Sequence, residues 1–138
     1  MFKREKRSFN NLKVNRRTDS DGFYENKSDR HFRDRRCVKK VNNVNVVSRH
    51  PNYIVGETNT NYYSFGFTHK DIKGKKHKNH LLDSNPNKND KRDSYIRKQM
   101  ESANKDQYSD YIIKNMKLSK QDDDYVTSLI EKRKQKKK

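Results

Sequence analysis

Apolar residues gather in the middle of the chain, where they occur in short runs separated by polar turns. Residues 44–47 are rich in valine, and residues 53–57 and 62–68 are rich in aromatic and β-branched side chains. The last two runs flank a polar segment, 58–61, of the kind that forms turns. The pattern therefore predicts a strand near 44–47, a break or sheet edge at Pro51, and a β-hairpin over about 52–69.

The register of this hairpin follows from its loop. If residues 59–60 form the loop, Ile54 is expected opposite Phe65 and Gly56 opposite Tyr63. Ile54, Phe65 and Tyr63 then share one face of the sheet. A slip of one residue would exchange the two faces.

The C-terminal third shows helical spacing instead. Tyr108, Tyr111, Ile112 and Met116 recur three to four residues apart, which predicts a helix over about 107–117. A loop over 83–93 is expected from its polar composition.

A second helix is expected over about 120–134. Ser119 stands three residues before Asp122, which is the form of a capping box at a helix start. Val126, Leu129 and Ile130 supply one apolar stripe, so the two helices are expected to pair and to pack on the sheet.

These elements define an α+β kernel over about 41–130, with a small two- or three-stranded antiparallel sheet and a C-terminal helix pair. Residues 1–40 are expected to form a basic, largely disordered arm. A basic loop over 70–93 lies inside the kernel, and residues 131–138 form a basic tail.

Composition explains why only a kernel is expected to fold. Hydrophobic residues make up 28% of the 138 residues, and the formal net charge is +17, from 35 Lys and Arg against 18 Asp and Glu. Low hydrophobicity with high net charge is typical of partly disordered chains. Such an excess repels itself unless a polyanion neutralises it, and nucleic acid is the commonest one in a cell. An anionic membrane surface or an acidic protein is a less common partner.

Other compartments find little support in the sequence. Cys37 is the single cysteine, so no intrachain disulfide is expected. No apolar run approaches the length of a membrane helix, and the basic N-terminus is not followed by an apolar stretch. A cytoplasmic protein without a membrane partner is therefore expected.

The basic residues form clusters, and these are the candidate phosphate contacts. Arginine is the residue best suited to bidentate contacts with phosphate or guanine. Residues 3–17 and 132–138 are expected to make further backbone contacts. The candidate nucleic-acid-binding residues are Arg30, Arg33, Arg35, Arg36, Lys39, Lys40, Lys73, Lys75, Lys76, Lys132, Arg133, Lys134 and Lys136.

Most aromatic residues of the hairpin are expected to be core, because the chain has no tryptophan and few leucines. Tyr62 is the best candidate for an exposed ring that stacks an unpaired base.

Chemistry beyond binding is weakly indicated. His69, His77 and His80 match no zinc-ligand spacing, so neither a metal nor another cofactor is expected. A metal-independent ribonuclease is one alternative, with Glu57 as base, His69 or His80 as acid, and Lys75 or Lys76 on the phosphate. Cys37 has basic neighbours but no catalytic partner.

Part of the chain resembles a known group of proteins. The resemblance is carried by segments 53–58, 63–69, 79–82, 85–87 and 95–98, followed by Leu118, Ser119 and Asp122. Over about 53–130 the chain is similar to small basic proteins encoded on phages and integrative elements of low-GC Gram-positive bacteria. The charged segment 70–78 and Asp93 depart from that pattern. The resemblance implies a mobile-element accessory protein and brings no catalytic residues with it.

The sequence therefore favours a non-enzymatic accessory protein that grips the phosphate backbone of DNA or RNA. Three alternatives stay open: a protein-binding inhibitor or interaction module, the ribonuclease, and a structural component of a ribonucleoprotein particle.

Overall fold

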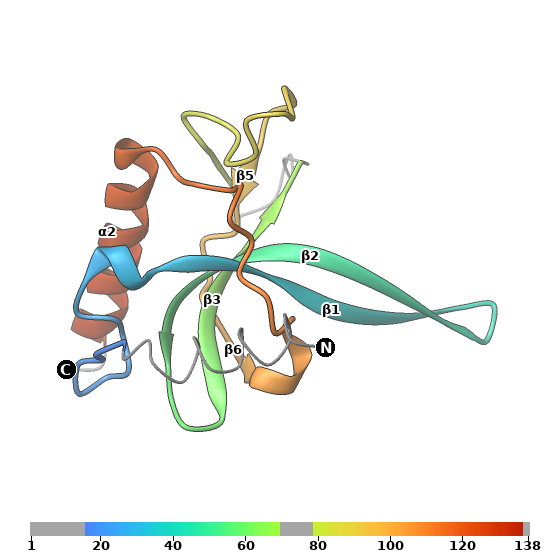
Figure 1. Cartoon of the computed structure of the whole chain (residues 1–138), viewed down its shortest axis with the longest axis horizontal. Coiled ribbons are helices and arrows are strands. Elements are labelled where there is room, and N and C mark those ends of the chain that lie inside the picture. Colours follow the sequence, from blue (N-terminus) through green and yellow to red (C-terminus); the bar gives the residue numbers. More distant parts are fainter. Residues whose placement is uncertain (1–15, 70–78, 137–138) are drawn as a thin grey trace, which may run out of the picture.

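The computed structural model describes residues 16–69 and 79–136. Within them the fold is an antiparallel sheet with one α-helix, which confirms the expected α+β class (Figure 1). The elements are the 3-10 turns η1 (Lys27–Asp29) and η2 (Lys105–Gln107), the strands β1 (His31–Val41), β2 (Val44–Glu57), β3 (Asn61–Thr68), β4 (His80–Leu81), β5 (Tyr95–Ile96) and β6 (Glu101–Asn104), and the helix α2 (Lys120–Lys136).

The strands lie in the order β1-β2-β3-β5-β4, and β6 also pairs with β3. The sheet is larger than expected because β1, β4, β5 and β6 add to the predicted hairpin. The last three are short strands of two to four residues. Each therefore depends on its neighbour for its hydrogen bonds.

The β2–β3 hairpin is confirmed, and its register is half right. Gly56 lies opposite Tyr63 as predicted, but Ile54 lies opposite Ser64, and Tyr53 lies opposite Phe65. A β-bulge between Ile54 and Gly56 causes this shift. The extra residue on β2 shifts by one position every β2–β3 pair that lies farther from the turn than the bulge.

The bulge decides which side chains enter which core. Tyr53 and Val55 join Phe65 and Phe67 in the main apolar cluster, which also contains Val126 and Ile130 of α2. Ile54 lies in a second, smaller cluster with Tyr24, Ala103 and Tyr108. Both faces of the central sheet are therefore covered.

Gly56 is required at the bulge by a close backbone approach. A Cβ at this position would lie 2.3 Å from the Gly22 carbonyl oxygen and 2.9 Å from the Phe23 Cα. The segment around Phe23 hydrogen-bonds to β2 here, through Tyr24 N to Val55 O at 2.9 Å and Glu57 N to Gly22 O at 2.8 Å. Residues 22–24 thus cover the edge of β2 beyond Ile54, which is opposite the first residue of β1.

The helix predicted over 107–117 is wrong. Only η2 is helical there, and the following residues run along β1 in an irregular extended path. Ser109 N donates to Asp34 O at 2.9 Å, and Ile113 N donates to Phe32 O at 2.8 Å. The backbone of this segment therefore bonds to β1 instead of forming the hydrogen bonds of a helix. In place of the predicted helix pair, the described residues contain the single helix α2.

The second predicted helix is confirmed as α2. The Ser119 hydroxyl accepts a hydrogen bond from Asp122 N at 3.2 Å, as the capping motif requires. The Asp122 carboxylate is buried and accepts from Asp83 N at 2.8 Å, which ties the helix start to the segment after β4. The described tail residues 131–136 continue the helix instead of leaving it.

The disordered arm predicted over 1–40 is wrong for residues 16–40. This part contains β1, whose first residues His31, Phe32 and Arg33 are buried. Its many charged residues do not show the apolar alternation of a strand, so the sequence pattern did not predict β1. Its stability comes from pairing with β2 over the whole register from His31 opposite Ile54 to Val41 opposite Val44.

The outer parts of β1 and β2 project from the body as a free two-stranded ribbon (Figure 1). Among residues 16–69 and 79–136, pairing of β2 with β3 ends at Asn52, and the last bridge from another segment to β1 reaches Arg35. We call residues 36–49 the distal ribbon. Its turn is formed by Asn42 and Asn43, with φ of 52° and 66°. Left-handed residues at both positions define the tight turn that suits the twist of a hairpin.

Candidate nucleic-acid interface

The distal ribbon carries positive charge without any acidic residue. Arg36, Lys39, Lys40 and Arg49 are all exposed, and the sequence contains no Asp or Glu from 35 to 56. In Figure 1 the ribbon extends away from the body on the side opposite α2. A large ligand can therefore approach it from several directions.

The pairing register separates the ribbon into two faces, because directly paired residues lie on the same face and successive residues alternate. The arginine face consists of Arg36, Val38, Lys40, Asn45, Val47 and Arg49. The valine face consists of Cys37, Lys39, Val41, Val44, Val46 and Ser48.

Two arginines of the arginine face are direct cross-strand partners. Arg36 lies opposite Arg49 in the β1–β2 register, and both residues are exposed. Like charges in directly opposed positions destabilise a sheet, by roughly 0.2–1 kcal/mol. An anion placed across the pair would remove this penalty, so the arrangement favours an anionic ligand.

The ribbon also exposes apolar surface. Five of the seven large hydrophobic residues that are exposed in the described part of the chain lie on it: Val38, Val41, Val44, Val46 and Val47, at 46–61% exposure. A clustered apolar surface of this kind marks an interaction site. The ribbon thus combines fixed charge with uncovered methyl groups.

Some of the predicted phosphate contacts serve the fold instead. Arg30 donates to the Asp123 carboxylate and to the Thr127 hydroxyl, both at 2.9 Å, and its side chain is 6% exposed. Arg33 is buried and donates to His31 Nε2 at 2.9 Å and to the Ser109 carbonyl at 3.1 Å. Neither guanidinium is presented to a ligand.

Of the remaining predicted contacts, some form ion pairs within the fold and others are exposed. Arg35 forms an ion pair with Glu101. Lys134 contacts Asp19 at 2.6 Å, whereas Lys132 and Arg133 are exposed on α2. Lys136 ends the helix. Lys73, Lys75, Lys76 and His77 lie outside the described residues.

Tyr62 is not placed as a stacking platform. It is half-buried, and its ring meets the Tyr108 ring edge-on at a centroid distance of 5.3 Å. The Arg33 guanidinium and the Lys105 ammonium each lie 5.1 Å from its centroid. These cation–π contacts occupy the ring within the fold.

The ribonuclease arrangement is not assembled in the described residues. The Glu57 carboxylate accepts from the Tyr24 hydroxyl at 3.0 Å and from Lys105 Nζ at 2.7 Å. Glu57 pairs with Tyr62 near the start of β3, whereas His69 follows the end of β3. Seven strand residues at 3.3 Å each separate them by about 23 Å.

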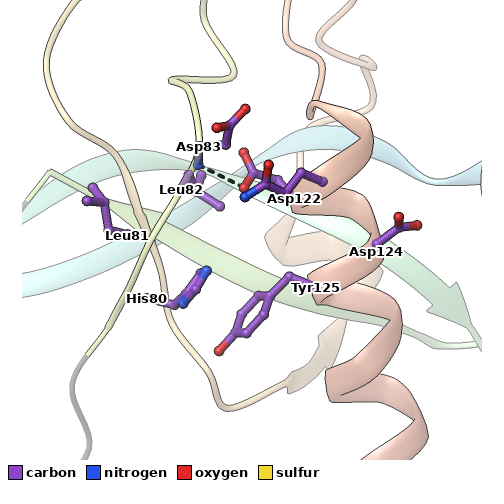
Figure 2. A pocket seen from close by; sticks show the side chains of 8 residues that line it. His80, Leu81, Leu82, Asp83, Asp122, Asp124 and Tyr125 are labelled. Atoms are coloured by element: carbon purple, nitrogen blue, oxygen red, sulfur yellow. Dashed lines mark hydrogen bonds between the residues drawn. The ribbon is translucent and has the colours of Figure 1, made fainter.

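His80 lies in an acidic pocket of 660 Å³ between β4 and the start of α2 (Figure 2). Its ring stacks on Tyr125, with centroids 3.6 Å apart and planes 13° from parallel. Burial lowers the pKa of His80, with the charge of Lys98 acting in the same direction and that of Asp122 opposing it. The pocket joins β4 to α2, and its carboxylates do not suit a phosphate ligand.

Two further findings bound the chemistry of residues 16–69 and 79–136. No group of three or more His, Cys, Asp or Glu side chains in these residues is arranged to hold a metal ion. None of their helices is long and apolar enough to cross a membrane.

Sequence reasoning missed Arg49 and the exposed valines. Apart from Val38, they lie in the segment from residue 41 onward that the sequence places in the folded kernel. The signal that could have revealed the ribbon was the pair Asn42 and Asn43 between valines, because adjacent asparagines tolerate the left-handed turn of a hairpin.

Comparisons of this chain with models of protein families, with curated protein sequences and with solved structures find no match. The assignment of a function therefore rests on the ribbon and its chemistry.

Proposed function

We propose that this protein is a non-enzymatic nucleic-acid-binding protein whose main contact surface is the distal ribbon. The observation that carries the proposal is the acid-free, exposed ribbon in which Arg36 faces Arg49. The surplus charge of the chain has the same sign as the ribbon, so it would also steer a polyanion toward the protein.

The ribbon predicts a measurable dependence on salt. If each of the four cationic side chains of the ribbon neutralises about one phosphate charge, the slope in log K against log[salt] on B-form DNA is about −3.6. These side chains are Arg36, Lys39, Lys40 and Arg49. Further contacts from the exposed Lys132 and Arg133 would make the slope steeper.

The test is fluorescence anisotropy with short labelled single- and double-stranded DNA and RNA at about 50 to 200 mM salt. The double variant Lys39→Gln/Lys40→Gln should bind more weakly and reduce the slope by about 2. The matched control is Lys88→Gln/Lys91→Gln, which removes the same charge from exposed positions of the 83–93 loop. Equal losses in both variants, or binding that does not depend on salt, would refute the proposal.

A protein partner is the second candidate, favoured by the open edges of the ribbon. In the described residues, 36–41 and 44–49 pair only with each other, so each strand has unpaired backbone groups along its outer edge. Such edges accept an added strand from a partner. A complex that survives nuclease treatment and is lost on Val47→Pro would support this candidate, because the backbone N–H at this position faces the outer edge of β2 and proline removes it.

A further inference from the structure

We propose that the ligand of the ribbon is double-stranded DNA, and that the arginine face lies against base edges in the major groove. This inference rests on the proposed function and extends it from phosphate contact to a particular nucleic acid and groove. Three properties of the distal ribbon support it: its dimensions, the side chains of one face, and its lack of aromatic rings.

The dimensions fit one groove better than the others. Two paired strands lie about 4.8 Å apart, and the six β1 residues from Arg36 to Val41 extend about 17 Å. The major groove of B-form DNA is about 12 Å wide and 8.5 Å deep, and it admits a two-stranded ribbon. The minor groove is about half as wide. The major groove of A-form RNA is too deep and narrow for side chains to read.

The arginine face carries the side chains that recognise base edges. Arg36 and Arg49 can each form a bidentate contact with guanine O6 and N7, and Asn45 can do so with adenine N6 and N7. Val38 and Val47, at 58% and 55% exposure, offer methyl groups to the thymine methyl. Lys40 lies opposite Asn45 and completes this face.

The ribbon lacks what single-strand binding uses. Unpaired bases stack on aromatic rings, and residues 36–49 contain no Phe, Tyr or Trp. In the sheet beside it, Phe32, Tyr53 and Phe65 are buried, and Tyr62 is held by its neighbours. A paired duplex, read from its groove, matches this surface better than separated strands do.

The valine face provides the internal control. It lies on the other side of the same strands and carries Val41, Val44 and Val46 with only Lys39 as a charge. If the arginine face meets the bases, the valine face points away from them. Val46 and Val47 are adjacent and similarly exposed, at 46% and 55%, but lie on opposite faces.

The experiment compares two duplexes of identical mixed sequence, one with guanine and one with 7-deazaguanine, which lacks the N7 acceptor in the major groove. Anisotropy titrations should show at least about fivefold weaker binding to the modified duplex. The double variant Arg36→Lys/Arg49→Lys keeps both charges but loses the bidentate fork. It should retain the salt slope and lose part of the preference for the guanine duplex, because the lysine ammonium can still donate to guanine but without the rigid fork.

The face assignment has its own readout. Val47→Ser should weaken binding to the unmodified duplex by about fivefold, and Val46→Ser should leave it unchanged. Equal affinity of the wild type for both duplexes, with Lys39→Gln/Lys40→Gln still defective, would overturn the groove inference and leave phosphate binding intact. Tighter binding to duplex RNA or single-stranded DNA would also overturn it. Full affinity of Lys39→Gln/Lys40→Gln would instead refute the proposed function itself.

Discussion

The opposed pair Arg36 and Arg49 predicts that one substitution will stabilise the fold and weaken binding together. Arg49→Glu converts a directly opposed like-charge pair into an ion pair on the exposed ribbon. Two unit charges about 5–7 Å apart interact in water by about 0.6–0.8 kcal/mol, and the substitution reverses the sign. Screening and side-chain freedom reduce the sum, so we expect a net gain of about 1 kcal/mol.

For a chain of 138 residues, this gain corresponds to a rise in Tm of about 3 °C. Binding should respond in the opposite direction, because Arg49 is lost and Arg36 gains an internal partner. In the proposed complex, two of the four cationic side chains would no longer neutralise phosphate charge, so the salt slope should fall from about −3.6 to about −1.8.

Thermal denaturation followed by circular dichroism measures the first effect, and anisotropy across a salt series measures the second. Arg49→Gln is the graded control, since it removes the repulsion without adding attraction, and it should lie between the wild type and Arg49→Glu in both assays. A Tm that falls in Arg49→Glu, or an unchanged salt slope, would contradict the reasoning.

Three other predictions concern the kernel. Gly56→Ala should destabilise the fold by several kcal/mol or prevent folding, whereas Gly66→Ala, where the nearest atom is 3.5 Å away, should be nearly neutral in urea denaturation; similar effects would disprove the close-approach argument. Burial lowers the pKa of His31 to about 3. Below about pH 6.5 this imidazole is therefore protonated in the unfolded chain but stays neutral in the folded chain. Stability should therefore fall by about 2 kcal/mol between pH 7 and pH 5, and His31→Gln should flatten that slope; a slope unchanged in the variant would exclude His31 as its source. Asp122→Ala should cost about 1–3 kcal/mol, because the buried Asp122 carboxylate is lost and Asp83 N loses its part-buried hydrogen bond; an unchanged urea midpoint would count against this role.

The sequence predicted those elements whose signal is local. The capping residues Ser119 and Asp122 predicted the start of α2, and the polar turn 58–61 predicted the β2–β3 hairpin. The helix predicted after Tyr108 was wrong for the opposite reason. Its residues have helical spacing, but their backbone forms hydrogen bonds with β1, which is far away in the sequence. Local pattern cannot weigh a partner that lies far away in the sequence.

The candidate site was predicted in outline and misplaced in detail. Clustered arginines drew attention to residues 30–40, but charge alone could not separate Arg30, which pairs with Asp123, from Arg36, which is exposed. That distinction depends on strand alternation and on the distance from the kernel. The valines of β2 were expected within the kernel, where apolar residues are usually buried, but the strand extends past the body that would cover them.

The turn at Asn42 and Asn43 sets a rule for how the length of the ribbon could change in related proteins. Adding one residue to each strand next to the turn leaves the existing pairs intact and extends the reach by about 3.4 Å. Adding one residue to each strand between the kernel and Arg36 would instead turn every outer side chain to the opposite face, so only additions of two would preserve the surface. Natural variants of this ribbon should therefore differ by even numbers of residues per strand at its base and by any number at its tip.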